Sequence, residues 1–171
     1  MRRCEVTATH PAAPGGAFQV SRVVAAPPEA VWRAWREPEL VRAWWGPTGF
    51  TCPRAALRFA EGEASVVTMR APDGTDVHDL WTYRLIRPYA RIEFDSRFCD
   101  EDGSAVSPSD VGLPPAVPEV VPHVVTLAAR EDTGTLLVVE ESGYRPGPVL
   151  DMSRQGQEQC LEKLAAAVEE R

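Results

Sequence analysis

The amino-acid sequence predicts an α+β domain, in which a curved antiparallel sheet of about seven strands wraps around a long C-terminal helix, with two short helices between strands 1 and 2. Three observations support this prediction. A series of short segments alternates polar and apolar residues, as half-buried strands do. Glycine-containing turns join several of these segments, so neighbouring strands should pair antiparallel. Apolar residues recur at helical spacing after the first strand and again at the C-terminus.

The N-terminal segment precedes any regular pattern. Residues 1–16 are rich in Pro, Ala and Gly and have no hydrophobic period, so we expect a flexible leader. The chain of 171 residues is long enough for one hydrophobic core and short for two. We therefore predict a single domain over residues 17–171. Its first strand should cover residues 17–24, where polar and apolar residues alternate.

Two short helices should follow the first strand. A proline pair favours a helix start, and apolar residues continue at helical spacing until Pro38, which should end this helix and let a second one begin. A Gly-Pro pair ends the second helix directly after Trp44 and Trp45. Because adjacent helical residues point about 100° apart, we expect one indole to anchor the helix to the sheet and the other to lie at the sheet edge or over a cavity. The alternative is that both are ordinary core residues.

Six further strands are predicted after the helices. Each is a short run of alternating or β-branched apolar residues bounded by turn residues. They cover residues 50–59, 64–70, 77–87, 91–98, 120–130 and 135–142. The tight turns at 72–75 and 131–135 each contain a glycine, which supplies the positive φ that hairpins need. Residues 99–119 contain four prolines and no period, so we expect a long connection there.

The chain should end in a helix over residues 151–171, with Asp151 or Ser153 as its N-cap. An apolar stripe runs along this helix through Cys160, Leu161, Leu164, Ala165 and Val168. A strongly bent sheet that closes on such a helix leaves a cavity between the two.

Composition excludes several classes of partner. The chain has 44% hydrophobic and 25% charged residues, as globular proteins do, and its net charge of -7 with scattered arginines argues against nucleic acid. No apolar run approaches the roughly 20 residues that span a bilayer, and the start lacks the apolar core of a secretion signal. The four cysteines form no C-x-x-C pair, and no metal or cofactor motif occurs. We expect a cytoplasmic protein with no membrane partner, no metal and no cofactor.

Three stretches carry a resemblance to a known family: "APPEAVWRAW" with "PELVRAWWGPTGFT", then "MRAPDGT", then "LIRPYARIEF". They resemble the proteins like the activator of heat-shock-protein ATPase, within the START and Bet v 1-like helix-grip superfamily (SRPBCC), and the resemblance covers residues 18–168. It implies a helix-grip fold. The chain departs from the family at Gly62, where a Gly-Gly pair is usual, and at Gly156-Gln157, where Gly-Trp is usual. Both departures lie along the wall or rim of the predicted cavity.

Strand alternation sorts the side chains that face this cavity. On the strand over 77–87 the more apolar row is Val77, Asp79, Trp81, Tyr83 and Leu85. The residues expected to bind a ligand are Trp45, Trp81, Tyr83, Phe94, Phe98, Val125, Leu127, Glu141, Leu161 and Leu164. Asp79 and His123 are the candidate catalytic residues, because if they approach each other either could orient or deprotonate a phenol or enol. The alternative is that the Asp, His and Glu at these strand ends are solvated at the sheet rim.

Three functions remain open at this point. The first is a cytoplasmic binding protein for a small hydrophobic or aromatic molecule held between sheet and helix. The second is an enzyme like the polyketide cyclases and aromatases of the same superfamily, although no catalytic motif occurs and activity is uncertain. The third is a protein that interacts with a chaperone ATPase, as the resemblance implies. A homodimer formed through an exposed sheet or helix surface is compatible with each of them.

Overall fold

The computed structural model describes residues 16–131 and 134–170 of the chain. Its elements are β1 (Gly16–Val24), α1 (Pro28–Arg36), α2 (Pro38–Trp44), β2 (Thr51–Ala56), β3 (Ala64–Arg70), β4 (Asp76–Arg87), β5 (Arg91–Cys99), the 3-10 helix η1 (Pro108–Val111), β6 (Val121–Ala129), β7 (Thr135–Tyr144) and α3 (Pro148–Glu169). The predicted leader and the middle of the predicted turn at 131–135 lie outside the described residues. No helix in the described ranges is long and apolar enough to cross a bilayer.

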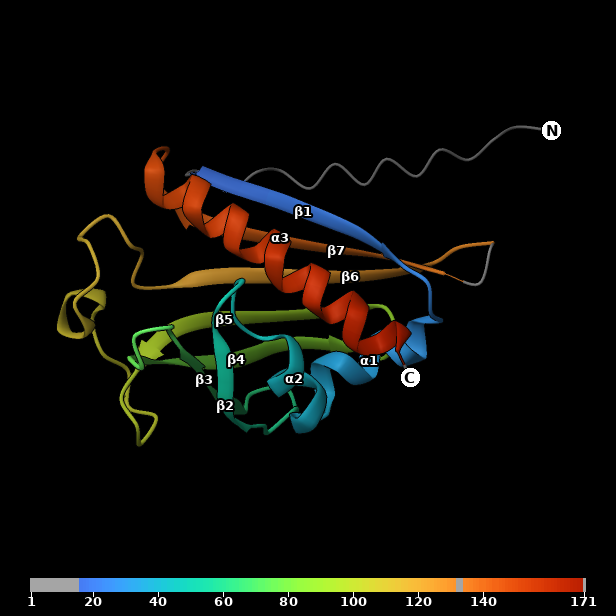
Figure 1. Cartoon of the computed structure of the whole chain (residues 1–171), viewed down its shortest axis with the longest axis horizontal. Helices are drawn as coiled ribbons and strands as arrows, with labels where there is room; N and C mark the ends of the chain where they lie inside the picture. The colour runs from blue at the N-terminus through green and yellow to red at the C-terminus, as the bar shows by residue number, and fades with distance from the viewer. Residues whose placement is uncertain (1–15, 132–133, 171) are drawn as a thin grey trace.

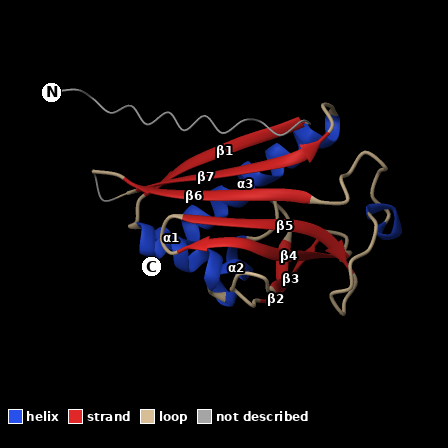
Figure 2. Ribbon diagram, turned by 180° about the vertical axis from the view of Figure 1, so that it is seen from behind, coloured by secondary structure: helices blue, strands red, loops and turns tan. Residues whose placement is uncertain are grey.

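All seven strands form one sheet in the order β1-β7-β6-β5-β4-β3-β2, and each neighbouring pair is antiparallel. Figure 1 shows α3 lying across one face of this sheet, with α1 and α2 beside its C-terminal half. Figure 2, which views the molecule from behind, shows that all three α-helices cover this same face. The α+β helix-grip architecture predicted from the sequence is confirmed, because one helix layer buries one face of a twisted sheet.

Prolines define where the helices begin. Pro28 and Pro38 occupy the first turns of α1 and α2, where a missing N–H costs nothing because that group has no partner inside a helix. The prediction that Asp151 or Ser153 caps α3 is wrong. Gly147 is the N-cap, and Pro148 begins the helix with its φ already fixed near the helical value. Asp151 lies in the first turn of α3 instead.

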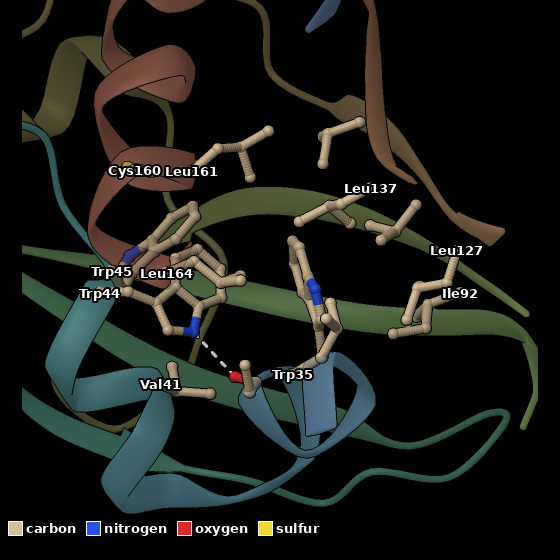
Figure 3. Close-up of a cluster of buried hydrophobic side chains, with 14 of the residues drawn as sticks. Trp35, Val41, Trp44, Trp45, Ile92, Leu127, Leu137, Cys160, Leu161 and Leu164 are labelled. Atoms are coloured by element: carbon tan, nitrogen blue, oxygen red, sulfur yellow. Dashed lines mark hydrogen bonds between the residues drawn. The ribbon is translucent and has the colours of Figure 1, made fainter. Parts of the chain in front are cut away.

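The two adjacent tryptophans are both buried, with 0% of Trp44 and 7% of Trp45 exposed. Trp44 packs against Trp35 with ring centroids 4.7 Å apart and donates from Nε1 to the carbonyl of Ala34 at 2.8 Å (Figure 3). Trp45 packs edge to face on Trp81 of β4 at 4.7 Å. Trp44 therefore ties α2 to α1, while Trp45 anchors the end of α2 to the sheet. Gly46, with φ 105, then turns the chain toward β2.

Val77, Leu85 and Phe98 of the predicted inward rows are only half-buried. Leu85 is only half-buried, because the β4–β5 register shifts between Tyr83 and Leu85 and Ile86 packs against the core instead. Phe98 is also half-buried, whereas the next residue, Cys99, is 1% exposed. The chain folds back over Cys99 through a bridge to Ala105, so the long connection covers this strand end. Phe98 pairs with Asp79 in the strand register, so it lies on the same face of the sheet as Asp79.

Candidate functional site

A buried polar cluster lies at one end of the sheet, under the start of α3. It contains Asp79 of β4, His123 of β6 and Glu141 of β7, whose exposed fractions are 5%, 4% and 5%. His123 pairs with both Phe94 and Glu141 in the strand register, which places these side chains in one row. In Figure 1 this is the end at which β7 leads into α3 and the Pro-rich connection leaves β5. The alternative that these groups are solvated at the rim is wrong.

His123 uses both of its ring nitrogens within the protein. Nδ1 lies 2.9 Å from the carbonyl oxygen of Val121, which can only accept, so Nδ1 carries a proton. Nε2 lies 3.2 Å from Oε1 of Glu141. Burial alone would lower the pKa of His123, but the charge and hydrogen bond of Glu141 and the carbonyl of Val121 outweigh it and raise that pKa. These contacts favour the imidazolium form of His123, whose ring is stacked on Phe94 with centroids 4.5 Å apart.

Glu141 is also fully engaged. While Oε1 meets His123, Oε2 accepts a hydrogen bond from the Tyr144 hydroxyl at 2.7 Å. Burial and the Glu141 charge raise the pKa of Tyr144, so its hydroxyl stays protonated and donates. The sequence analysis missed Tyr144, because strict alternation from Glu141 points residue 144 to the opposite face. Gly143, with φ 91, breaks that alternation and turns Tyr144 inward.

Asp79 differs from its neighbours because it keeps unused hydrogen-bonding capacity. Its Oδ2 is buried without a partner among the described residues. Burial raises the pKa of Asp79 to about 7; the Trp45 indole and the His123 charge oppose this rise and Glu141 adds to it. The Trp45 N–H lowers the pKa of Asp79, but the two groups do not meet in ordinary hydrogen-bond geometry. Trp45 Nε1 therefore also has no hydrogen-bond partner among the described residues. Asp79 and His123 are thus coupled through charge, while the direct ion pair of His123 is with Glu141.

Several buried donors also have no hydrogen-bond partner among the described residues. Nε1 of Trp45 and Nε1 of Trp81 belong to two rings in contact, and Trp81 lies two residues from Asp79 on the same face of β4. The third donor is Nε2 of Gln157 on α3. Gln157 lies one turn from Cys160, whose pKa responds to the charge of Asp79, so it faces the same region. The fourth unpartnered donor in the described ranges, Nε1 of Trp35, lies in the aromatic core.

Most of the other predicted ligand residues lie in the hydrophobic core of the domain. Those in the buried core are Trp45, Trp81, Tyr83, Phe94, Val125, Leu127, Leu161 and Leu164. The Tyr83 hydroxyl is already paired with Ser65 Oγ at 3.0 Å, and burial raises the pKa of Tyr83 to about 12. In the middle of the sheet, Trp35, Trp81 and Phe94 pack ring against ring. This part of the interior is filled by indole and phenyl rings.

Among the hollows on the described part of the surface, two are well defined, and neither is lined by a predicted ligand residue. One of about 490 Å³ lies between α2 and β2 and is bordered by Glu39, Arg42, Ala43, Thr51, Cys52 and Pro53. The other, of about 350 Å³, lies under the Pro-rich connection and is bordered by Pro115, Ala116, Val117, Pro118, Glu119, Val120, Gly143 and Arg145. Val120 and Gly143, which border the second hollow, are chain neighbours of Val121 and Tyr144, but no residue of the polar cluster lines it. No group of His, Cys, Asp and Glu in the described ranges is arranged to hold a metal ion.

The turn after α2 is fastened to α3, and this fixes Trp45 over Asp79. Lys163 Nζ donates to the carbonyls of Gly46 and Phe50 at 2.8 and 3.2 Å. The Thr48 N–H donates to Gln159 Oε1 at 3.0 Å. These bonds join residues more than 110 positions apart in the chain. They hold the turn that follows Trp45 against α3.

Replacing Lys163 with methionine should lower the free energy of unfolding by about 1 to 3 kcal/mol, because two partly buried carbonyls lose their donor. Urea denaturation followed by tryptophan fluorescence measures the change. Arg154→Met is the matched control, since Arg154 pairs only with Glu158 on the exposed side of α3. Equal midpoints for the two variants would show that the turn is not fastened through Lys163.

Comparison with known proteins agrees with this architecture. A protein from Chromobacterium violaceum is 27% identical, with 90% of this chain and 96% of that chain covered at a TM-score of 0.72. A protein from Arthrobacter aurescens is 24% identical over 91% of this chain and 87% of that one, also at 0.72. A Silicibacter pomeroyi protein, 17% identical over 88% and 96%, has a TM-score of 0.70. No curated protein matches the sequence.

The family model described as activator of Hsp90 ATPase homolog 1-like protein matches residues 25–169, from the end of β1 to the end of α3. This range contains both short helices, the Trp-Trp-Gly-Pro turn and the buried polar cluster. The chain belongs to the family of activator of Hsp90 ATPase homolog 1-like proteins.

Proposed function

We propose that this protein binds a small aromatic or hydrophobic molecule between α3 and the polar end of the sheet. The observation that carries the proposal is the set of buried polar atoms at and near Asp79 that have no hydrogen-bond partner among the residues that the structure describes. Nearly all buried polar atoms in folded proteins are hydrogen-bonded, so several unpaired ones in one place favour a further binding partner. Helix-grip proteins of this family, with their sheet and helix layers, provide a suitable frame for such a site.

The surroundings of Asp79 favour an uncharged ligand. Trp45, Trp81 and Leu161 supply apolar wall, and an apolar wall with a few placed polar groups is typical of small-molecule sites. Asp79 and Glu141 would repel an anion at close range. The hollow under the Pro-rich connection is bordered by Gly143, the chain neighbour of Tyr144, at this end of the sheet. We place the protein in the cytoplasm as part of this proposal, because Cys52, Cys99 and Cys160 are free thiols.

One observation favours a second candidate function, that of a cyclase-like or aromatase-like enzyme. With a pKa of about 7, Asp79 could exchange a proton with a bound substrate near neutral pH. His123 would then act through its charge, because Glu141 and Val121 occupy both of its nitrogens. The family's name implies a role with a chaperone ATPase. We do not propose this role here, because a shared fold by itself does not transfer function.

A panel of hydrophobic and aromatic compounds should contain at least one that raises the melting temperature and quenches tryptophan fluorescence, because Trp45 and Trp81 border the site. A ligand at a hundred times its Kd should add about 2.7 kcal/mol to the free energy of unfolding. Gln157→Trp should block the site from α3, whereas Gln155→Trp, on the exposed side of the same helix, should leave binding intact. If no compound in the panel binds, or both variants bind alike, the proposed site is wrong.

A further inference from the structure

We propose that the ligand of this site is a neutral phenol, whose hydroxyl group donates a hydrogen bond to Asp79 Oδ2 and accepts one from a neighbouring buried N–H. This inference rests on the proposed function and narrows it to a substrate class. It comes from counting which hydrogen-bonding atoms in the polar cluster the protein has already used and which it has not.

The charged pair is closed to a ligand. Both nitrogens of His123 have partners, in Val121 and Glu141. Both oxygens of Glu141 also have partners, in His123 and Tyr144. Phe94 covers one face of the imidazole ring. His123, Glu141 and Tyr144 therefore satisfy one another's hydrogen-bonding atoms. They act on a ligand through the electric field of their charges and not through direct contacts.

The unused atoms are one acceptor and three donors. The acceptor is Asp79 Oδ2, and the donors are Nε1 of Trp45, Nε1 of Trp81 and Nε2 of Gln157. The residues that carry them are at least nine-tenths buried, so bulk water does not serve them. Leaving such atoms unpaired costs free energy, which a ligand with matching groups would recover.

A hydroxyl group is the smallest group that matches this set. It donates one hydrogen bond and accepts others at a single oxygen atom, so it can meet Asp79 and an indole N–H together. A carboxylate accepts only, and it would face the charges of Asp79 and Glu141. An ammonium donates only and leaves the indole N–H groups unpaired. An ether accepts only and leaves Asp79 Oδ2 unpaired.

The aromatic side chains beside Asp79 favour a hydroxyl group that is carried by an aromatic ring. The rings of Trp45 and Trp81 meet edge to face at 85°, and Phe94 lies 5.0 Å from Trp81. Aromatic rings prefer such edge and offset contacts with one another, so a flat ring extends this arrangement. A phenol is also a stronger donor to a carboxylate than an aliphatic alcohol is, because its O–H is more acidic. The rings that fill the middle of the sheet limit the ligand to a small ring system.

A series of compounds of similar size tests the inference on the full chain. Calorimetry at pH 8, where Asp79 is charged, compares 2-naphthol with naphthalene, 2-methoxynaphthalene and 2-naphthoate. We expect 2-naphthol to bind at least about tenfold more tightly than the methyl ether and the hydrocarbon, which is the value of one hydrogen bond to a charged group. We expect 2-naphthoate to bind most weakly.

Two variants test the assigned atoms. Asp79→Leu should abolish the preference for 2-naphthol over 2-methoxynaphthalene, whereas Asp76→Leu, at the exposed start of β4, should keep it. Trp45→Phe retains an aromatic ring without the N–H and should reduce the preference for 2-naphthol over naphthalene, which gives a second measurement if Asp79→Leu does not fold. Retention of the full preference over 2-methoxynaphthalene in Asp79→Leu, or of the full preference over naphthalene in Trp45→Phe, would overturn the assignment of those atoms.

The outcomes separate this inference from the proposed function. Equal binding of naphthalene, 2-methoxynaphthalene and 2-naphthol would overturn the phenol class and leave the proposed function intact. Tightest binding of 2-naphthoate would overturn it in favour of an anion site. If none of the four compounds binds while another compound of the hydrophobic panel does, the phenol class is also wrong. If nothing in either set binds, the proposed function itself fails.

Discussion

Replacing Asp79 with asparagine should raise the free energy of unfolding at pH 8 by up to about 4 kcal/mol, while leaving it nearly unchanged at pH 4. The carboxyl group of Asp79 is buried, and burial raises its pKa from 3.8 to about 7. At pH 8 the native protein holds a buried carboxylate, whose charge is costly in a poorly solvated place. Asparagine has nearly the same shape without that charge. Chemical denaturation of both proteins across pH 4 to 8 measures the difference.

The sign follows from proton linkage. Between pH 3.8 and about 7 the folded protein keeps a proton on Asp79 that the unfolded chain has lost, so the free energy of unfolding falls as pH rises through this window. The pKa of His123 is also raised, so the free energy of unfolding continues to fall as pH rises above the pKa that His123 has in the unfolded chain. This part of the fall should persist in Asp79→Asn. Asp76→Asn is the control with the opposite sign, because Arg70 lowers the pKa of Asp76 and stabilises its charged form. A difference between Asp79→Asn and the wild-type protein that does not grow from pH 4 to pH 8 would refute the assigned environment of Asp79.

Replacing Glu141 with leucine should lower the free energy of unfolding by about 3 to 5 kcal/mol, the usual cost of removing one member of a buried ion pair. The change leaves His123 Nε2 and the Tyr144 hydroxyl without their acceptors. His123 must then give up its proton or stay charged without a partner. The pKa of His123, followed by NMR of the imidazole protons, should fall in the same variant.

The neighbouring residue on β7 provides the control. Glu140 lies on the opposite face of the strand and is half exposed, so Glu140→Leu should change the free energy of unfolding by less than about 0.5 kcal/mol. The double variant His123→Leu, Glu141→Leu should be more stable than Glu141→Leu alone, because it removes the unpaired charge together with its partner. A double variant as unstable as the sum of the two single changes would mean that the pair is not coupled.

Much of the fold was predictable because it follows from local periodicity. The inward rows that carry Asp79, His123 and Glu141 were predicted correctly, since alternation along a regular strand fixes which face a side chain takes. Leu85 was assigned wrongly because a bulge shifts the register by one residue, and the sequence carries no clear mark of it. Gln157 was missed, although it lies three and four positions before Cys160 and Leu161 of the predicted apolar stripe.

The sequence by itself determined the order of strands and helices, the turn after Trp45 and the faces that become buried, because these depend on residues close together in the chain. Only the tertiary structure decided that His123 pairs with Glu141 and that Asp79 keeps an unused oxygen. That choice depends on the register between β5 and β6, whose long connection has no turn motif to set it, and on how α3 lies over the sheet. Hydrogen bonds form or fail over a few tenths of an ångström, so packing across the whole domain selects which buried groups are paired.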